Sequence, residues 1–358
     1  MDFTHTEDRR MISDSLRRYL ADQYGIEHRN QAAYEAPFHD TGKWAELAEL
    51  GILGALVTED QGGFGGHGFD IAVVFEELGR GLCPEPVLGN LLALRLYAAL
   101  GQTERVDAII AGTARAAVAV HETDAFVDLD EIAITANGSG DSVTLTGRKS
   151  VVYGGNSADH ILVVAKNASG LGLYEIAPGD AEVMGYAMID GGGAAEVILE
   201  NTQATTLSED ARGIIEAALD AGRLALCAEA VGIMDVLRDT VKDYLLQRQQ
   251  FGRPIALFQA LQHRLVDFSI EIEQARSIVI LAASKLDAED RALHIARAKN
   301  LIGRAGKLVA EEAIQMHGGI GMTWEYGASH YAKRLIMLDA QLGDTEDQLR
   351  TSMELAAA

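Results

Sequence analysis

A short polar segment, RQQFGRP at residues 248–254, is the first place in this sequence where residue types suggest chemistry. It contains Arg248, Phe251 and Gly252 within five positions. Two interpretations are open. In the structural one a helix ends here, with Gly252 as its left-handed cap and Pro254 beyond it. In the functional one Arg248 binds a phosphorylated ligand, because a guanidinium fork matches phosphate oxygens in pairs.

A second segment, QMHGGIGMTWEY at residues 315–326, is rich in glycine. Its glycines are Gly318, Gly319 and Gly321. Glycine has no Cβ, so a flat or phosphorylated ligand can approach the backbone closely at such a turn. The structural alternative is again a helix stop, and His317 beside the glycines is interpreted as a packing residue at a helix end.

Long amphipathic helices are predicted around these segments, because apolar residues recur every three or four positions. One stripe predicted to be buried is Leu257, Leu261, Leu265, Phe268, Ile272, Ala275 and Val279. A second is Ala298, Ile302, Ala305, Val309, Ala313 and Met316. A third, of small side chains, is Ile214, Ala218, Ala221, Ala225, Ala228 and Gly232. Small faces let helix backbones approach closely, so we expect a helical bundle.

The rest of the chain predicts a helical, then β, then helical order. Residues 5–110 read as helices interrupted by a glycine-rich loop at 59–70, and Glu76, Glu77 and Arg80 are expected on a solvated helix face. Short alternating runs such as DSVTLTGRKSVVY predict strands. The predicted fold is mainly α with a central β domain. Its parts are an N-terminal α-helical domain (1–115), a small antiparallel β-sandwich or barrel (116–206) and a C-terminal four-helix bundle (207–358).

Composition excludes several function classes. A formal net charge of −23 argues against general binding to nucleic acid or to anionic membranes. The cysteines, Cys83 and Cys227, provide neither a disulfide framework nor metal-ligand spacing. The N-terminus is charged and no apolar run is long enough to span a membrane. We therefore expect a cytoplasmic protein without a metal site.

The two segments and the helices between them resemble the acyl-CoA dehydrogenase family. The family pattern is R-x-x-F-G, then a helix with a glutamine, then Q-x-x-G-G-x-G. The matching residues are Arg248, Phe251, Gly252, Gln259, Gln315, Gly318, Gly319 and Gly321. The stretches WAELAELGILGALVTEDQGGFGG and VFEELGRGL are similar to the same family. The resemblance covers nearly the whole chain, and the motifs are specific in combination.

The resemblance implies a two-electron flavoprotein that acts on an acyl-CoA substrate and passes electrons to an electron-transfer flavoprotein. FAD would lie between the β domain and the bundle. In the family the two segments reach across a subunit interface to the pyrophosphate and adenosine half of a neighbour's FAD. The residues that it assigns to the cofactor are Arg248, Phe251, Gly252, Gln259, Gln315, Gly318, Gly319 and Thr345.

The family's catalytic base is absent from both of its usual positions. The base is a glutamate, usually in a Y-E-G-T stretch that reads LGDT here, with Gly343 in its place and Thr345 retained. Some members carry it on the first bundle helix, where this chain has Gly222 before Arg223. Glycine cannot accept a proton, so no catalytic residue is assigned. Asp344 is the nearest carboxylate, and its shorter, shifted side chain makes it a poor substitute.

The predicted flavin-ring site also departs from the family. The stretch that lines the ring aligns with HETDAFVD at 121–128, where Phe126 replaces a glycine and Val127 a serine. The stacking tryptophan is replaced by Val151, although Tyr153 retains a hydroxyl. The residues that the family uses to bind a neighbour's FAD are thus retained. Those that would contact the chain's own flavin ring, or act as its base, differ from the family pattern.

This pattern favours one subunit of a heteromeric α2β2 acyl-CoA dehydrogenase, whose partner supplies the glutamate and the ring site. Some heteromeric members act on CoA thioesters of steroid side chains, which suggests lipid or steroid side-chain degradation. Two alternatives stay open. One is a self-sufficient homotetramer that uses another acid such as Asp344, and the other is a non-catalytic scaffold that binds acyl-CoA or FAD.

Overall fold

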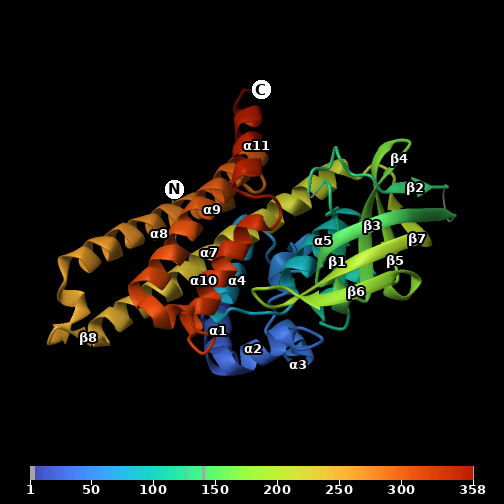
Figure 1. Cartoon of the computed structure of the whole chain (residues 1–358). Coiled ribbons are helices and arrows are strands. Elements are labelled where there is room, and N and C mark those ends of the chain that lie inside the picture. The colour runs from blue at the N-terminus through green and yellow to red at the C-terminus, as the bar shows by residue number, and fades with distance from the viewer. Residues whose placement is uncertain (1–4, 126, 139–141, 358) are drawn as a thin grey trace. The chain divides into compact units, whose positions relative to one another are not determined.

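The structure, a computed structural model, describes residues 5–125, 127–138 and 142–357 (Figure 1). Contacts divide the chain into two compact units. The first comprises residues 1–26, 68–83 and 223–358, and is here called the helical unit. The second comprises residues 27–67 and 84–222, and is called the β unit. This grouping follows contacts in space, so segments distant in the chain share a unit.

The helical unit is organised around its C-terminal helices. Its helices are α1 (Glu7–Gln23), α4 (Gly68–Gly81), α8 (Gln259–Lys285), α9 (Arg291–His317), α10 (Gly327–Ala340), α11 (Thr345–Ala357) and α7 (Arg212–Gln247) from Arg223 onward. A short hairpin of β8 (Gln249–Gln250) and β9 (Arg253–Pro254) and the 3-10 turn η5 (Ile255–Leu257) join α7 to α8. Another 3-10 turn, η6 (Gly318–Met322), follows α9. Helix α9 packs against α8, α10 and α11.

Two of the predicted stripes behave as expected. Every residue of the α9 stripe is buried, and the small stripe of α7 allows close packing against α4. A Cβ on Gly79 would lie 2.2 Å from the Glu229 carbonyl oxygen, and one on Gly232 would lie 2.0 Å from that of Glu76. The glycines on each helix therefore set the α4–α7 distance.

The α8 stripe is correct only in part. Phe268, Ile272, Ala275 and Val279 are buried, but Leu257 is 56% exposed, so its predicted burial is wrong. The physical reason is that Leu257 lies in η5, before α8 begins, and does not share the helical periodicity.

The expectation of a solvated face at Glu76, Glu77 and Arg80 is also wrong. Glu77 is 2% exposed and binds the Arg17 guanidinium group at 2.6 and 2.9 Å. Arg80 bonds to Glu76 at 2.9 Å and pairs with Asp235 of α7.

Asp235 is the centre of this network and is only 2% exposed. Its carboxylate accepts hydrogen bonds from Arg276 of α8 at 2.7 and 2.8 Å and pairs with Arg80 and Arg238. Burial alone would raise the pKa of Asp235, but the bonds from Arg276 and the charges of the other arginines outweigh it and lower this pKa. The network thus joins α4, α7 and α8.

The β unit contains a closed barrel. Its strands are β1 (Ala116–Ala119), β2 (Thr135–Asn137), β3 (Val143–Tyr153), β4 (His160–Asn167), β5 (Gly170–Ile176), β6 (Glu182–Ala187) and β7 (Gly193–Ser208). The order β4-β2-β3-β7-β5 closes because β5 also pairs with β4, while β1 extends from β4 and β6 pairs with β7. The helices of this unit are α2 (Ile26–Tyr34), α3 (Thr41–Glu49), α5 (Val87–Ala99) and α6 (Thr103–Ile110).

The predicted fold class is confirmed: N-terminal helices, a central β-barrel and a C-terminal helical part. One detail is corrected, because β4 pairs in parallel with β1 and β2, so the sheet is mixed rather than purely antiparallel. Strand β3 alternates buried Val143 and Leu145 with more exposed neighbours, and its inward residues join the barrel core. The three-domain boundaries stay a prediction.

Two histidines of the β unit, His39 and His160, lie beside arginines. The Arg115 Nη1 donates to His39 Nε2 at 3.0 Å, and the other ring nitrogen of His39 bonds to the Pro37 carbonyl at 3.1 Å. Arg105 Nη1 lies 3.2 Å from His160 Nε2. Burial lowers the pKa of both histidines. At His39 the hydrogen bond to Pro37 opposes this and the charge of Arg115 adds to it, and at His160 the charge of Arg105 adds to it while Glu175 opposes it. The neutral imidazole is therefore the form that fits the fold.

Lowering the pH from 7.5 to 5.5 is expected to lower the free energy of unfolding. The histidines of the unfolded chain take up protons near their ordinary pKa of about 6.5, whereas those of the folded chain take them up only at lower pH. The stability that the neutral histidines contribute is therefore present above about pH 6.5 and is lost as the pH falls below it. Urea unfolding at both pH values measures the effect. The His39→Gln, His160→Gln double variant serves as the control and should show a smaller pH dependence; an equal dependence would contradict the assignment.

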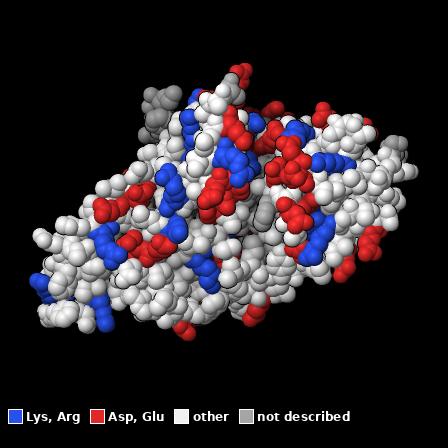
Figure 2. Space-filling model, turned by 45° about the horizontal axis from the view of Figure 1, so that its top comes forward, with Lys and Arg blue, Asp and Glu red and all other residues white. Residues whose placement is uncertain are grey.

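The surface carries side chains of both charges. Figure 2 shows Lys and Arg side chains interspersed with Asp and Glu on the face drawn. Several arginines of the chain pair with acids, as Arg148 does with Glu196 at 2.8 Å. Among the described residues, no helix combines the length and apolar character needed to cross a bilayer, and no group of His, Cys, Asp and Glu side chains is placed to bind a metal.

Candidate functional site

The RQQFGRP segment forms a tight hairpin that follows α7. The helix ends at Gln247, and the Arg248 amide donates to the Tyr244 carbonyl at 2.8 Å. Gln250 then pairs with Arg253, which leaves Phe251 and Gly252 as the two turn residues, with φ values of 54° and 77°. The interpretation of Gly252 as a helix cap is therefore wrong: Gly252 is left-handed, but as the second residue of a two-residue hairpin turn.

The hairpin presents an aromatic ring to solvent at a cost in backbone strain. Turns with two positive φ values favour Asn or Gly at the first position, whereas Phe251 occupies it here and is 91% exposed. The Phe251 ring meets the edge of Phe258 with centroids 6.0 Å apart, and the Arg253 guanidinium lies 4.3 Å from the Phe258 centroid. Strain of this kind is typical of functional positions, because stability alone does not select it.

The glycine turn at the end of α9 is equally exposed. Gly318 has a φ of 67°, which favours glycine for backbone reasons. Gly319 has no positive φ, and a Cβ built on it meets no atom within 4 Å. By contrast, a Cβ on the buried Gly321 would lie 2.9 Å from that of His317. The fold of this chain thus explains Gly318 and Gly321, whereas Gly319 fits a molecule that approaches from outside.

The two turns lie at the same end of the helical unit. The Arg264 guanidinium of α8 binds Glu312 of α9 at 2.8 and 3.0 Å, which aligns the start of α8 with the end of α9. The rings of Tyr244 and His317 lie 4.9 Å apart, which places the end of α7 beside them. Seven residues assigned to the cofactor by resemblance are exposed here and are called the clamp surface: Arg248, Phe251, Gly252, Gln259, Gln315, Gly318 and Gly319.

The turn predicted to correspond to the family's base position has Gly343 at the predicted place. It connects α10, which ends at Ala340, to α11, which begins at Thr345. Gly343 is buried with a φ of 98°, and Leu342 before it has a φ of 58°. The Leu342 carbonyl accepts from Arg223 Nε at 2.9 Å. Gly222, the other position predicted for the base, is buried within α7.

Asp344 caps helix α11. Its side chain is exposed, and its Oδ1 accepts from the Glu346 and Asp347 amides, both at 2.9 Å. Next to it, the Thr345 hydroxyl donates to Asp339 Oδ1 at 2.8 Å. The Asp344 carboxylate is thus occupied by the backbone of its own helix, and the assignment of Thr345 to a cofactor stays a prediction.

Lys299 stabilises the turn between α10 and α11 through hydrogen bonds. The sequence analysis did not identify this residue. Its Nζ donates to the carbonyls of Leu338, Asp339 and Gly343 at 3.0, 2.7 and 3.1 Å, and the side chain is 1% exposed. Burial lowers the pKa of this ammonium group. A lysine directly beside Ala298 of a buried stripe was the available signal, since a buried ammonium group needs acceptors.

The stretches predicted to face a flavin ring are partly described. Phe126 lies outside the described residues, and Val127 is half-buried in a turn. Val151 has a φ of 47° at a bulge of β3, an unusual value for a β-branched residue. Tyr153 is 8% exposed, and its ring meets that of His121 edge-on at 5.5 Å.

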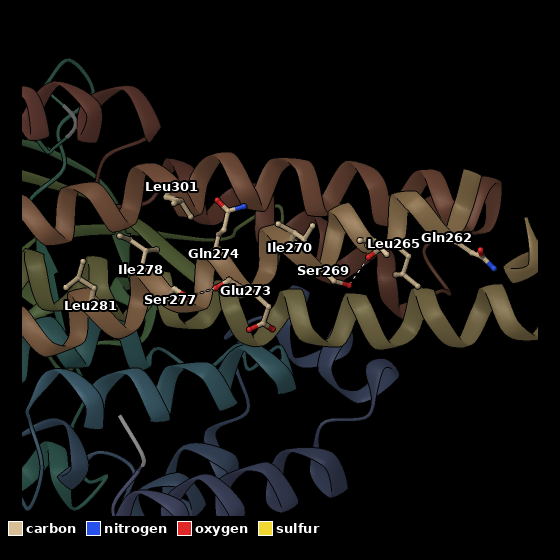
Figure 3. A pocket seen from close by; sticks show the side chains of 11 residues that line it. Gln262, Leu265, Ser269, Ile270, Glu273, Gln274, Ser277, Ile278, Leu281 and Leu301 are labelled. Carbon is tan, nitrogen blue, oxygen red and sulfur yellow. Dashed lines mark hydrogen bonds between the residues drawn. The ribbon is translucent and has the colours of Figure 1, made fainter. Parts of the chain in front are cut away.

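The outer face of α8 is apolar and open. Val266 is 57% exposed and Ile270 51%. With Leu265, Ile278, Leu281 of α8 and Leu301 of α9 they line a shallow groove of about 970 Å³ (Figure 3). Figure 3 shows Glu273 and Gln274 among these apolar side chains. We call this groove the α8 face; the predicted stripe did not include Val266, Ile270 or Leu281.

Comparison with known proteins gives consistent matches. The family model described as "Acyl-CoA dehydrogenase, N-terminal domain" matches residues 6–116, and that described as "Acyl-CoA dehydrogenase, C-terminal domain" matches residues 212–355. The chain is similar to "Acyl-CoA dehydrogenase IpdE2" of Mycolicibacterium smegmatis, with 29% identity over 351 residues that cover 96% of this chain and 97% of that protein.

Solved structures agree over the full length. A variant of the Tcur3481–Tcur3483 steroid ACAD superposes with a TM-score of 0.90 and 28% identity and covers 98% of each chain. The ChsE4–ChsE5 complex from Mycobacterium tuberculosis gives a TM-score of 0.91 with 25% identity, covering 100% of this chain and 99% of that one.

Proposed function

The chain belongs to the acyl-CoA dehydrogenase family of oxidoreductases, and from this premise we propose that it is the glutamate-lacking subunit of a heteromeric acyl-CoA dehydrogenase. In that assembly a partner subunit supplies the base for α,β-dehydrogenation of an acyl-CoA thioester. One observation carries the proposal: the two positions predicted for the base are glycines, Gly343 and Gly222, while the seven residues of the clamp surface are exposed.

The family is FAD-dependent, and the clamp surface fits the pyrophosphate and adenosine half of this cofactor. When bound, FAD supplies the acceptor for the hydride that leaves the substrate. Arg248 provides a charged fork for pyrophosphate oxygens, and Phe251 provides an aromatic face. Gly319, which has open space in front of its Cα, permits close approach of the ligand to the backbone. All three point to a ligand held at the surface, as expected if the cofactor is shared with another chain.

The α8 face supports an assembly. Apolar side chains such as Val266 and Ile270, half-exposed in the single chain, are typical of surfaces covered by a partner. Gln262 of this face follows Gln259 of the clamp surface by one helical turn, so the two surfaces are continuous along α8. We propose that the helical unit of the partner subunit covers the α8 face and brings its cofactor to the clamp surface.

The substrate class is proposed from relatives. The structure matched at 28% identity is described as a steroid ACAD, and the ChsE4–ChsE5 structure is a complex of two chains. We propose a lipid or steroid side-chain CoA thioester as substrate, an α2β2 heterotetramer, an electron-transfer flavoprotein as acceptor and a cytoplasmic location. A self-sufficient homotetramer is less well supported, because Asp344 caps α11.

Arg248→Ala is expected to weaken FAD retention by the assembled enzyme about tenfold to hundredfold, since a hydrogen bond to a charged group contributes roughly 1.5–3 kcal/mol. Gly319→Ala should also weaken retention while leaving the melting temperature unchanged, because its Cβ meets no atom of the chain. Flavin absorbance after ultrafiltration measures both effects.

Two surface variants serve as matched controls. Arg350→Ala removes an arginine side chain that is 68% exposed on α11, and Gly179→Ala adds a Cβ into open space in the β unit. Neither should change flavin retention. If Arg248→Ala and Gly319→Ala retain as much flavin as these controls, the clamp assignment is wrong.

A further inference from the structure

The clamp surface has two arms, the hairpin that begins at Arg248 and the glycine turn that begins at Gly318, and both arms are bonded to the same pair of aromatic residues. The first arm starts at Arg248, whose amide is bonded to the Tyr244 carbonyl at 2.8 Å. The second arm starts at Gly318, directly after His317. The rings of Tyr244 and His317 are in contact, with centroids 4.9 Å apart. Arg248 is hydrogen-bonded to the first of these residues and Gly318 is covalently bonded to the second, so the same ring pair supports both segments.

His317 is buried and is held by one hydrogen bond and two ring contacts. The side chain is 3% exposed, and its Nδ1 donates to the Ala313 carbonyl at 2.7 Å. Its ring lies between Tyr244 of α7 and Tyr326, which precedes α10, at 4.9 and 5.1 Å. Burial lowers the pKa of His317, so the ring is neutral near pH 7. These contacts restrain the ring between α7 and the segment before α10, and Gly318 follows it directly.

We propose that His317 is a positioning residue that sets the spacing between Arg248 and the Gly318–Gly319 turn. The proposal rests on the proposed function, since it concerns the same clamp surface. The ligand chemistry is a dinucleotide, whose pyrophosphate and adenosine must meet the two arms together. Without the ring, α7 and α9 lose their contact at this end, and the arms bind independently and more weakly.

The test compares His317→Ala, which removes the ring, with His317→Phe, which keeps a ring but loses the nitrogen donor. FAD retention by the complex with the glutamate-bearing subunit is measured by ultrafiltration, at a temperature where all variants are fully folded by circular dichroism. Val279→Ala, which truncates a buried α8 residue outside the clamp surface, controls for general loss of stability.

We expect His317→Ala to lower FAD retention about tenfold, the loss expected when one arm no longer acts with the other, while His317→Phe and Val279→Ala stay within about twofold of the wild type. Arg248→Ala should then cost less in the His317→Ala background than alone, because contacts that act together are not additive. A purely structural role of His317 would not produce this dependence.

Two other outcomes separate the hypotheses. Normal retention in His317→Ala together with a strong loss in Arg248→Ala would overturn the positioning role and leave the clamp standing. Unchanged retention in Arg248→Ala itself would overturn the clamp, and with it the premise of this inference.

Discussion

Asp344→Asn is expected to leave kcat of the assembled enzyme unchanged, whereas replacing the partner's catalytic glutamate by glutamine should lower it about 10²–10⁴-fold, the usual contribution of a positioned general base. The reason is that both backbone amides bonded to Asp344 Oδ1 belong to the first turn of α11. Asparagine caps a helix as well as aspartate does, so the substitution changes the charge and keeps the structure. A steady-state assay with an artificial electron acceptor measures both rates.

Asp344→Ala provides the matched control. Loss of the cap should cost about 0.5–2 kcal/mol of stability, visible as a lower melting temperature, with no loss of rate at temperatures where the protein is folded. A large loss of rate in Asp344→Asn, with flavin content intact, would assign the base to this chain and refute the partner-supplied glutamate.

Asp235→Ala is expected to destabilise the protein by about 3 kcal/mol, near the lower end of the range for breaking one side of a buried ion pair. The carboxylate is 2% exposed and neutralises charge from Arg80, Arg238 and Arg276, which its removal leaves crowded together. The arginines are between a fifth and a third exposed, so solvent screens part of the cost. Urea unfolding, followed by the helical circular dichroism signal, measures the change in the free energy of unfolding.

Asp239→Ala, four residues further along α7, is the control. Its side chain is 64% exposed and pairs with Arg238, so we expect a change below about 0.5 kcal/mol. Equal destabilisation by the two substitutions would show that the network around Asp235 contributes little beyond helix propensity.

Hydrophobic periodicity predicted the helices and strands because it reports which faces are buried. The stripe from Ala298 to Met316 is buried in full, since α9 lies at the centre of the helical unit and has neighbours along its length. Helix α8 has a second apolar face at Val266 and Ile270, outside the predicted stripe and exposed in the single chain. Periodicity alone does not distinguish the core of one chain from a surface that another chain covers.

Local turn chemistry was harder to predict. A glycine followed by proline two residues later is typical of a helix end, but Phe251 at a positive φ turns the segment into a hairpin. Phenylalanine is rarely found there, so no propensity rule indicates it. The ion-pair network was missed for a related reason: Glu77 and Arg80 look like an ordinary exposed helix surface until α1 and α7 are placed beside them.

The candidate site was predicted as a set of exposed residues, but not what fixes them. Arg248 and Gly319 were identified from motifs, and the structure places them at one end of the helical unit. Two supports carry no motif: Lys299 of α9 binds the turn before α11, and Tyr244, at the end of α7, contacts His317 of α9. Such contacts depend on packing between segments distant in sequence, which a single sequence does not show.

The flavin content of the pure chain tests the central claim most directly. Flavin absorbance is compared with protein concentration for the chain expressed alone and for the chain co-expressed with a glutamate-bearing family subunit. The account predicts little or no FAD on the chain alone and a yellow complex with the partner, because the clamp surface is exposed while the predicted flavin-ring site departs from the family at Val127 and Val151. Full FAD occupancy in the pure chain would contradict it.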